Sequence, residues 1–274
     1  MYGVFYGLRE DPFNVTPDPA FLFFSGKHQD TFATILDGIT RRRGFMAITG
    51  SIGTGKTTLC RALLERLGDE VRSALVINPS LSPLQLLQTI MEDFEIVVRK
   101  QDRKGYFDAL NGFLMDVARR GSTAILILDE AQDLAPSTLE EIRLLSNFET
   151  NKKKLLQVIL VGQPELGDLL AKPSMAQVRQ RITVWANLAP LDREETEQYI
   201  AHRIWVAGGQ GMLIFDSDAV DEIFLYSQGV PRMINIICDN VLSMDFTRRT
   251  GARPGDSAEE AGTEQMTLAT PPGP

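Results

Sequence analysis

A glycine-rich segment from Gly50 to Thr57 constrains the fold of this chain more than any other feature. It reads Gly-Ser-Ile-Gly-Thr-Gly-Lys-Thr, which matches the pattern G-x-x-x-x-G-K-[ST] of phosphate-binding loops. The apolar run Phe45–Ile48 comes before it, and a helical pattern, Thr57–Leu67, follows. A strand, a tight turn and a helix in this order form the context that such a loop requires. The sequence therefore predicts a P-loop in an α/β domain.

The residue types of this segment suit the phosphates of a nucleoside triphosphate. Glycines let the backbone approach a phosphate with its N–H groups pointing inward, and the following helix contributes the positive end of its dipole. Lys56 can reach the β- and γ-phosphates, while the Thr57 hydroxyl can bind Mg²⁺. A turn that matches by chance is the alternative, which the flanking pattern disfavours. We expect ATP and Mg²⁺ as ligands, with ATP held by Gly50, Ser51, Ile52, Gly53, Thr54, Gly55, Lys56, Thr57 and Thr58.

A second motif ends an apolar strand further along the chain. The run Ala124–Leu128 is followed directly by Asp129 and Glu130, which is the Walker B pattern. Asp129 would hold the Mg²⁺ shell, and Glu130 would polarise the attacking water as a general base. Two exposed carboxylates after a buried strand are the plain alternative, which the P-loop upstream disfavours. The second acid favours hydrolysis of ATP over binding alone.

Gln163, Arg179, Arg181 and Arg232 could complete a nucleotide-hydrolysing site. Gln163 ends the next apolar run, where a polar side chain can sense the γ-phosphate, but it is also an ordinary turn residue. Arg179 and Arg181 precede the final strand, and an arginine there can reach a neighbouring subunit's site and offset charge on the γ-phosphate. Arg232 opens the last helical pattern and could fold over the phosphates. For the arginines the alternative is a solvated surface, and spacing does not decide between Arg179 and Arg181.

Short apolar runs alternate with amphipathic stretches between residues 45 and 187. The predicted strands are Phe45–Ile48, Ala74–Ile77, Ala124–Leu128, Gln157–Val161 and Thr183–Ala186. The predicted helices are Thr57–Leu67, Pro83–Phe94, Tyr106–Arg119 and Ser137–Phe148. Ser137 with Glu140 forms a predicted capping box. Apolar strands in alternating βα units predict an α/β fold in which a parallel sheet is sandwiched by helices.

The flanking regions predict three further parts. Residues 1–44 form an N-terminal arm, in which aromatic residues pin an irregular segment onto the core, and a helix from Gln29 to Arg42. Residues 188–248 form a small all-α domain, whose first helix begins with a capping box of Asp192 and Glu195. Its predicted helices are Arg193–Ala207, Ser217–Ser227 and Pro231–Thr247. Residues 249–274 form a tail that we expect to be disordered, because it is rich in Pro, Gly, Ala, Thr and acid.

Charge and composition exclude several classes of function. The 274 residues carry a net charge of −8 with a pI of about 5.0, so the chain is not a generic nucleic-acid binder. Two histidines and two cysteines leave no zinc site, and Cys60 and Cys238 suit the core of a protein in a reducing compartment. No signal peptide is visible. No apolar run approaches the length of a membrane span.

Two dense basic runs and one histidine each allow two interpretations. Arg41–Arg43 and Lys152–Lys154 each precede a predicted strand. Such runs are usually solvated corners, but they could also dock an acidic partner or nucleic acid. His28 could border the adenine pocket or be a partly buried structural residue.

Taken together, these motifs resemble the AAA+ ATPases. Further segments are Tyr6-Gly7-Leu8, Pro12-Phe13, Thr16–Pro19, Gly44-Phe45, Gly162–Leu166, Arg179–Ile182 and Gly229–Asn235. With these segments the chain resembles, within the AAA+ ATPases, the family of general secretion pathway protein A. The resemblance covers about residues 1–248, and full-length secretion members continue into a transmembrane helix and a periplasmic region.

The resemblance implies a cytoplasmic, oligomeric ATPase, at the inner face of the membrane through a partner, that drives assembly of an envelope secretion machine. It assigns ATP and Mg²⁺ to Lys56, Thr57, Asp129 and Glu130, the sensor 1 role to Gln163 and the sensor 2 role to Arg232; the helical domain is the AAA+ lid. Two alternatives stay open: a DNA-associated ATPase of the transposition type, against which the acidic balance argues, and a nucleotide switch with little turnover, against which Glu130 argues.

Overall fold

The computed structural model describes residues 2–16, 18–68, 71–77, 81–150, 153–211 and 214–251. The chain forms two compact units. One is Gly26–Ala189, and the other combines the first 25 residues with the residues from Pro190 onward. The predicted helix within the arm of residues 1–44 therefore belongs with the first unit and the aromatic segment with the second. The predicted boundaries at 44, 187 and 248 stay a prediction, and the tail from residue 252 lies outside the described residues.

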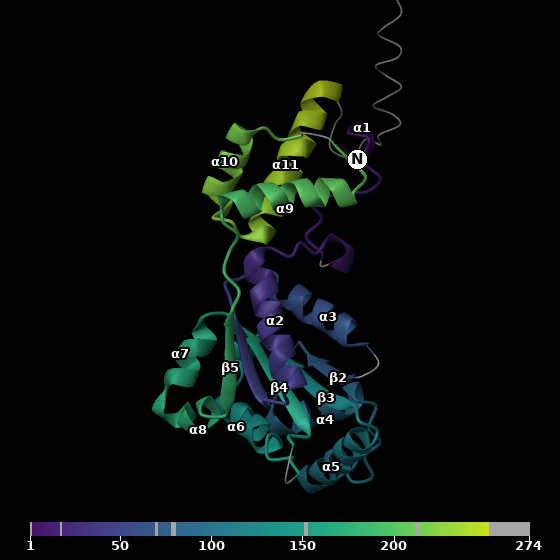
Figure 1. Ribbon diagram of the computed structural model, residues 1–274, viewed down its shortest axis with the longest axis vertical. Coiled ribbons are helices and arrows are strands. Elements are labelled where there is room, and N and C mark those ends of the chain that lie inside the picture. The colour runs from purple at the N-terminus through teal and green to yellow at the C-terminus, as the bar shows by residue number, and fades with distance from the viewer. Residues whose placement is uncertain are drawn as a thin grey trace, which may run out of the picture. The chain divides into compact units, whose positions relative to one another are not determined.

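A parallel sheet forms the centre of the first unit (Figure 1). Its strand order is β2-β3-β4-β1-β5, and every neighbouring pair is parallel. β4 is buried along its whole length, as expected of a parallel strand covered on both faces. The strands are β1 (Phe45–Thr49), β2 (Val71–Val76), β3 (Thr123–Leu128), β4 (Leu156–Gly162) and β5 (Ile182–Asn187).

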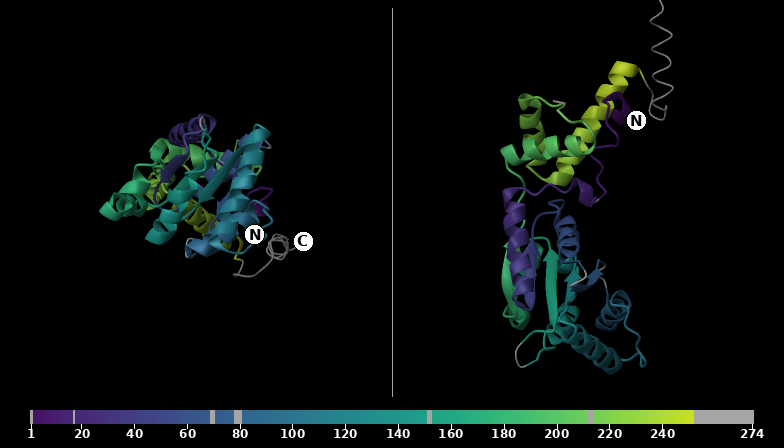
Figure 2. Two further views of the ribbon diagram at one scale, coloured as in Figure 1. Left: turned by 90° about the horizontal axis from the view of Figure 1, so that it is seen from below. Right: turned by 45° about the vertical axis from the view of Figure 1, so that its right-hand side comes forward.

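Helices cover both faces of this sheet, which confirms the predicted sandwich. Alternate strand residues such as Leu126 and Val158 join a core with α4, α5 and α6. On the other face α2 packs so closely that a Cβ at Gly38 would lie 2.6 Å from the Met46 sulfur. Figure 2 shows α2 and α5 on opposite sides of the strands. The helices are α2 (Gly26–Thr40), α3 (Lys56–Leu67), α4 (Pro83–Asp93), α5 (Arg103–Arg119), α6 (Pro136–Leu145), α7 (Glu165–Ala171) and α8 (Ala176–Arg179).

Two capping boxes were predicted at helix starts, and the structure contains one of them. The capping box at Asp192 and Glu195 is present and opens α9 (Arg193–Val206), as predicted. The box predicted at Ser137 and Glu140 is wrong, because α6 begins one residue earlier, at Pro136, with no side-chain cap. Proline is preorganised for the first helical position and needs no N–H partner there, so the serine falls inside the helix.

The second unit is built from three longer helices and the first residues of the chain. Its core joins apolar residues of α9, α10 and α11 to Phe13 and Phe21, so the aromatic arm does pack onto a core. Arg203 ties the arm down, donating to the Pro12 and Asn14 carbonyls at 2.5 and 3.0 Å. In the residues that the structure describes, no helix combines the length and apolarity that a membrane crossing requires. The helices are α1 (Tyr2–Phe5), α9 (Arg193–Val206), α10 (Ser217–Ser227) and α11 (Pro231–Thr250).

Candidate functional site

The P-loop connects the carboxyl end of β1 to the first turn of α3. Gly53 and Gly55 have φ angles of +80° and +95°. Glycine adopts such angles without strain, whereas a residue with a Cβ is strained there. A Cβ at Gly50 would lie 2.6 Å from the Leu188 carbonyl oxygen, so this position also requires glycine. The backbone geometry therefore explains the three glycines of the motif that the sequence singled out.

Lys56 is the first residue of α3, and its side chain turns back into the loop. It is only 6% exposed, and its ammonium donates to the Gly50 and Ser51 carbonyls at 2.8 and 3.0 Å. Burial lowers the pKa of Lys56, and the carboxylates of Glu130 and Asp129 oppose that change. A buried ammonium inside the loop is placed to meet an anion, as the sequence predicts.

Thr57 and Asp129 face each other across the edge of the sheet. The Thr57 hydroxyl donates to Asp129 Oδ2 at 2.5 Å, and Asp129 Oδ1 accepts from the Glu130 N–H at 2.9 Å. A hydroxyl and a carboxylate are hard oxygen ligands, and Mg²⁺ at nucleotide sites typically takes few protein ligands and completes its shell with water and phosphate. The pair therefore fits the metal that the motifs predict.

Glu130 follows β3 in a left-handed conformation, with φ 51° and ψ 39°. That conformation is unfavourable for a non-glycine residue and is typical of functional sites, where surrounding contacts hold it. Its carboxylate Oε2 accepts from Gln132 Nε2 at 2.9 Å and is 3.4 Å from Gln163 Nε2. The predicted base and the predicted sensor 1 residue therefore meet, although they come from different strands.

Gln132 takes part in this arrangement, and the sequence analysis missed it. Its side-chain oxygen accepts from the Gln163 backbone N–H at 2.9 Å, so one amide contacts both predicted site residues. The only signal in the sequence was its position two residues after Glu130, the second acid of the Walker B pattern. The contacts of Gln132 form only in the folded protein, where the ends of β3 and β4 lie together.

The predicted arginines lie elsewhere. Arg179 and Arg181 precede β5, and therefore lie at the amino edge of the sheet, opposite the P-loop. Arg181 donates to Asn147 Oδ1 at 3.1 Å, whereas the exposed Arg179 side chain has no hydrogen bond or ion pair to any residue that the structure describes. Arg232 is exposed in the first turn of α11, in the helical unit.

His28 touches the P-loop from α2. It is buried, and its Nε2 is 3.2 Å from the Thr54 carbonyl oxygen. This contact supports the structural interpretation of His28, and the adenine role stays a prediction.

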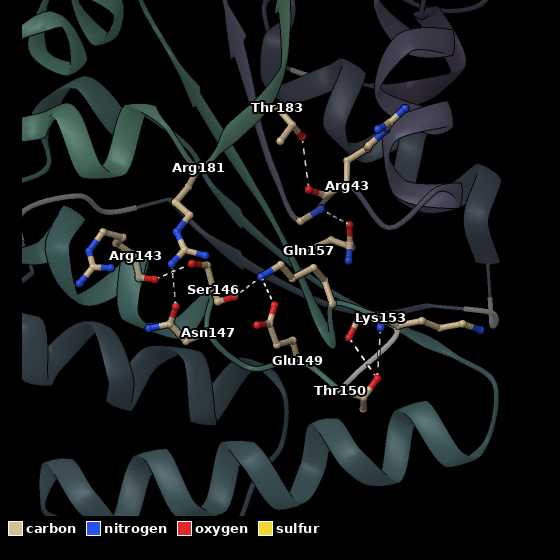
Figure 3. A network of polar contacts seen from close by, with 12 residues as sticks. Arg43, Arg143, Ser146, Asn147, Glu149, Thr150, Lys153, Gln157, Arg181 and Thr183 are labelled. Carbon is tan, nitrogen blue, oxygen red and sulfur yellow. Dashed lines mark hydrogen bonds and ion pairs between the residues drawn. The ribbon is translucent and has the colours of Figure 1, made fainter.

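The basic runs converge at the amino edge of the sheet. Since β1 and β4 are neighbours, the loops that precede them adjoin, and they enclose a groove of about 650 Å³. Arg41 pairs with Asp37 at 2.7 Å and Lys154 pairs with Glu149. Figure 3 shows the Lys153 side chain extending away from the polar network of this region. Lys152 lies outside the described residues. The groove is lined by Thr40, Arg41, Arg42, Glu149, Thr150, Lys153 and Lys154.

Comparison with known proteins gives two kinds of match in sequence. A family model described as an AAA domain matches residues 39–170. General secretion pathway protein A of Aeromonas hydrophila is 41% identical over 249 residues, covering 90% of this chain and 45% of that protein. The chain thus spans less than half the length of this curated relative.

Solved structures with the same fold are more distant in sequence. The ORC2 protein of Aeropyrum pernix, with ADPNP and ADP, has 17% identity and a TM-score of 0.65, covering 97% of this chain and 74% of that chain. Cdc6p of Pyrobaculum aerophilum has 18% identity and a TM-score of 0.66, with coverages of 89% and 67%. The RuvB branch migration motor of Thermotoga maritima has 16% identity, a TM-score of 0.52 and coverages of 88% and 69%. At such identities the likeness concerns the fold alone.

Proposed function

Because the chain belongs to the AAA+ ATPase family of general secretion pathway protein A, we propose that it hydrolyses ATP to drive assembly of an envelope secretion or export machine. One observation carries the enzymatic part of the proposal. Lys56, the Thr57–Asp129 pair and Glu130 all lie at the carboxyl edge of one sheet, within reach of the same loop. The secretion part rests on the relative, and it includes a protein partner and a cytoplasmic location at the inner face of the membrane.

Each residue has a distinct role in the proposed reaction. The P-loop N–H groups and Lys56 bind the β- and γ-phosphates, after the Lys56 ammonium exchanges its carbonyl partners for phosphate oxygens. Mg²⁺ held by Thr57 and Asp129 would neutralise charge on those phosphates. Glu130 accepts a proton from the attacking water. Gln163 lies close enough to Glu130 to help orient that water.

In the proposed reaction, arginines that lie away from the carboxyl edge of the sheet complete the ATP site. We assign the finger that acts on a neighbouring subunit to Arg179, because Arg181 is already bonded to Asn147. A guanidinium there would offset charge that grows on the γ-phosphate in the transition state. Arg232 would contact the phosphates from the helical unit. The active form is therefore a homo-oligomer.

The P-loop assignment is tested with Lys56→Ala and the matched control Lys153→Ala, an exposed lysine at the opposite edge. Removal of the Lys56 ammonium should abolish tight ATP binding in calorimetry, because the phosphate charge then has no cation within the loop. Lys153→Ala should bind and hydrolyse ATP like the wild type, and chelation of Mg²⁺ should stop wild-type turnover. Wild-type affinity in Lys56→Ala would refute the assignment.

A DNA-associated ATPase of the transposition type is the second candidate, and the basic groove favours it. Two runs that are more than 100 positions apart in sequence combine into one positive surface, on a chain whose net charge is −8. Phosphate backbones bind to such clusters of Lys and Arg. Arg41 and Lys154 are each paired with a carboxylate, which reduces the charge on offer and makes this function second.

A further inference from the structure

We propose that Gln132 is a positioning residue, which holds the carboxylate of Glu130 in place by tying it to the end of β4. The inference rests on the proposed ATP hydrolysis, since Glu130 is the base of that reaction. It assigns a function to a side chain that lies outside both sequence motifs.

The contacts of the Gln132 amide admit one orientation only. Its Nε2 donates to Glu130 Oε2 at 2.9 Å and to Asp133 Oδ2 at 3.1 Å, while its Oε1 accepts from the Gln163 N–H at 2.9 Å. Rotating the amide by 180° would point its oxygen at two carboxylates and its NH₂ at an N–H donor. Every hydrogen bond would then become a repulsion, so the bridge is specific for an amide in this orientation.

The backbone around Gln132 is shaped for this bridge. The left-handed conformation of Glu130 starts a tight turn, closed by the Asp133 N–H donating to the Glu130 carbonyl at 3.0 Å. The turn folds the Gln132 side chain back over Glu130. Because such a conformation persists only where surrounding contacts hold it, the amide bridge and the turn support each other.

Gly162, the last residue of β4, leaves room for the bridge. A Cβ at this position would lie 2.8 Å from Gln132 Oε1, closer than a carbon and an oxygen can approach without displacement. The Gly162 carbonyl also accepts from the Gly50 N–H at 3.2 Å. Gln132 therefore sits where the ends of β3 and β4 meet the base of the P-loop.

The bridge matters because a general base must be oriented before it can act. A glutamate side chain has three rotatable bonds, and a misplacement of about 1 Å can cost about 100-fold in rate. Gln132 and Gln163 both approach Oε2, and no described residue donates to Oε1. The second oxygen is thereby left to accept the proton of water.

Two variants separate the two ends of the bridge. Gln132→Met removes both contacts at similar size, whereas Gln132→Glu keeps an acceptor for the Gln163 N–H and loses the donor to Glu130. We expect Gln132→Met to lower kcat by about 10- to 100-fold, a part of what a general base contributes, with ATP affinity unchanged. Gln132→Glu should lower kcat at least as far, because its carboxylate also repels Glu130 and Asp133. Gln101→Met, at an exposed loop position, should behave like the wild type.

Amide hydrogen exchange gives a readout that does not depend on turnover. In nucleotide-free protein studied by NMR, the Gln163 N–H should exchange faster in Gln132→Met, because its acceptor is gone. In Gln132→Glu it should stay protected although turnover is lowered. A merely structural role of Gln132 would instead lower the melting temperature and expose neighbouring amides of β4 equally.

The outcomes are distinguishable from those for the proposed function. A wild-type protein without Mg²⁺-dependent turnover would refute ATP hydrolysis itself. Turnover in the wild type with an unchanged kcat in Gln132→Met would refute the positioning role, and a raised kcat would show that Gln132 restrains the base. If Gln132→Met does not fold, kcat of Gln132→Glu decides in the same way: an unchanged or raised value would refute the positioning role.

Discussion

The two edges of one parallel sheet differ in what holds their side chains. At the carboxyl edge, Lys56 and Asp129 are buried, and the side chains of Thr57 and Gln132 each donate a hydrogen bond to a carboxylate of the site. At the amino edge, Arg41 and Lys153 are exposed around an open groove. The first edge is organised before any ligand arrives, and the second offers charge without a fixed geometry.

This difference has a physical cause. Binding phosphate through backbone N–H groups demands particular dihedral angles, so the carboxyl edge needs glycines at fixed positions. Attraction of a polyanion needs only clustered positive charge, which is screened over about 8–10 Å at physiological salt. Substitutions at the carboxyl edge should therefore change catalysis, and substitutions at the amino edge should change association.

Arg179 is the expected exception with the largest effect, because it lies at the amino edge of its own sheet and yet should affect catalysis. We expect Arg179→Ala to lower kcat by about 1000-fold with ATP affinity retained, as for arginine fingers supplied by a neighbour. Arg181→Ala should have a smaller effect, because its guanidinium is occupied by Asn147. We would measure steady-state turnover and ATP affinity of both variants and compare them with the wild type.

Mixing shows whether the arginine acts between subunits. Arg179→Ala combined with Lys56→Ala should regain some turnover, because one subunit supplies an intact P-loop and the other an intact finger. Wild-type specific activity should also rise with protein concentration. Activity that is independent of concentration, without recovery at any mixing ratio, would point to a monomeric ATPase and leave both arginines as surface residues.

Substitutions in the basic groove should have a smaller effect, on DNA binding and not on turnover. Wild-type binding to duplex DNA should be weak, with a Kd of about 10⁻⁴ to 10⁻⁶ M at physiological salt, and should fall steeply as salt rises. The double variant Arg41→Glu with Lys153→Glu should bind less and show a shallower salt dependence in fluorescence anisotropy, with turnover unchanged. Arg248→Glu, in the helical unit, is the matched control. Submicromolar, salt-resistant binding would promote the transposition-type function over the secretion one.

Local patterns were sufficient for the parts of the site that depend on backbone geometry. Gly53 and Gly55 adopt the positive φ angles for which only glycine is suited, and Asp129 follows a strand whose apolar run is unmistakable. The same reasoning failed at Ser137, where the neighbouring proline set the start of α6. Placement of the arm aromatics in the core of the helical unit required contacts with α9, which no local pattern encodes.

Features that depend on strand order could not be predicted. Gln132 contacts Gln163 across 31 positions, and its role becomes visible only when β3 and β4 are neighbours. The groove likewise needs β1 beside β4, because Arg41 and Lys153 belong to loops that are distant in sequence. Gln132 carries no local signature, since an amide is ordinary in any loop. The two basic runs are visible in the sequence, but their convergence is not.

Trapping of nucleotide by Glu130→Gln shows whether the carboxyl edge hydrolyses ATP with Glu130 as the base. The variant is incubated with Mg²⁺ and ATP, isolated, and its bound nucleotide is quantified, with Glu149→Gln of the amino edge as control. We predict bound ATP and turnover lowered by about 10²- to 10⁴-fold, since the amide accepts no proton while Thr57 and Asp129 are intact. Bound ADP with near wild-type turnover in Glu130→Gln would show that Glu130 is not the base.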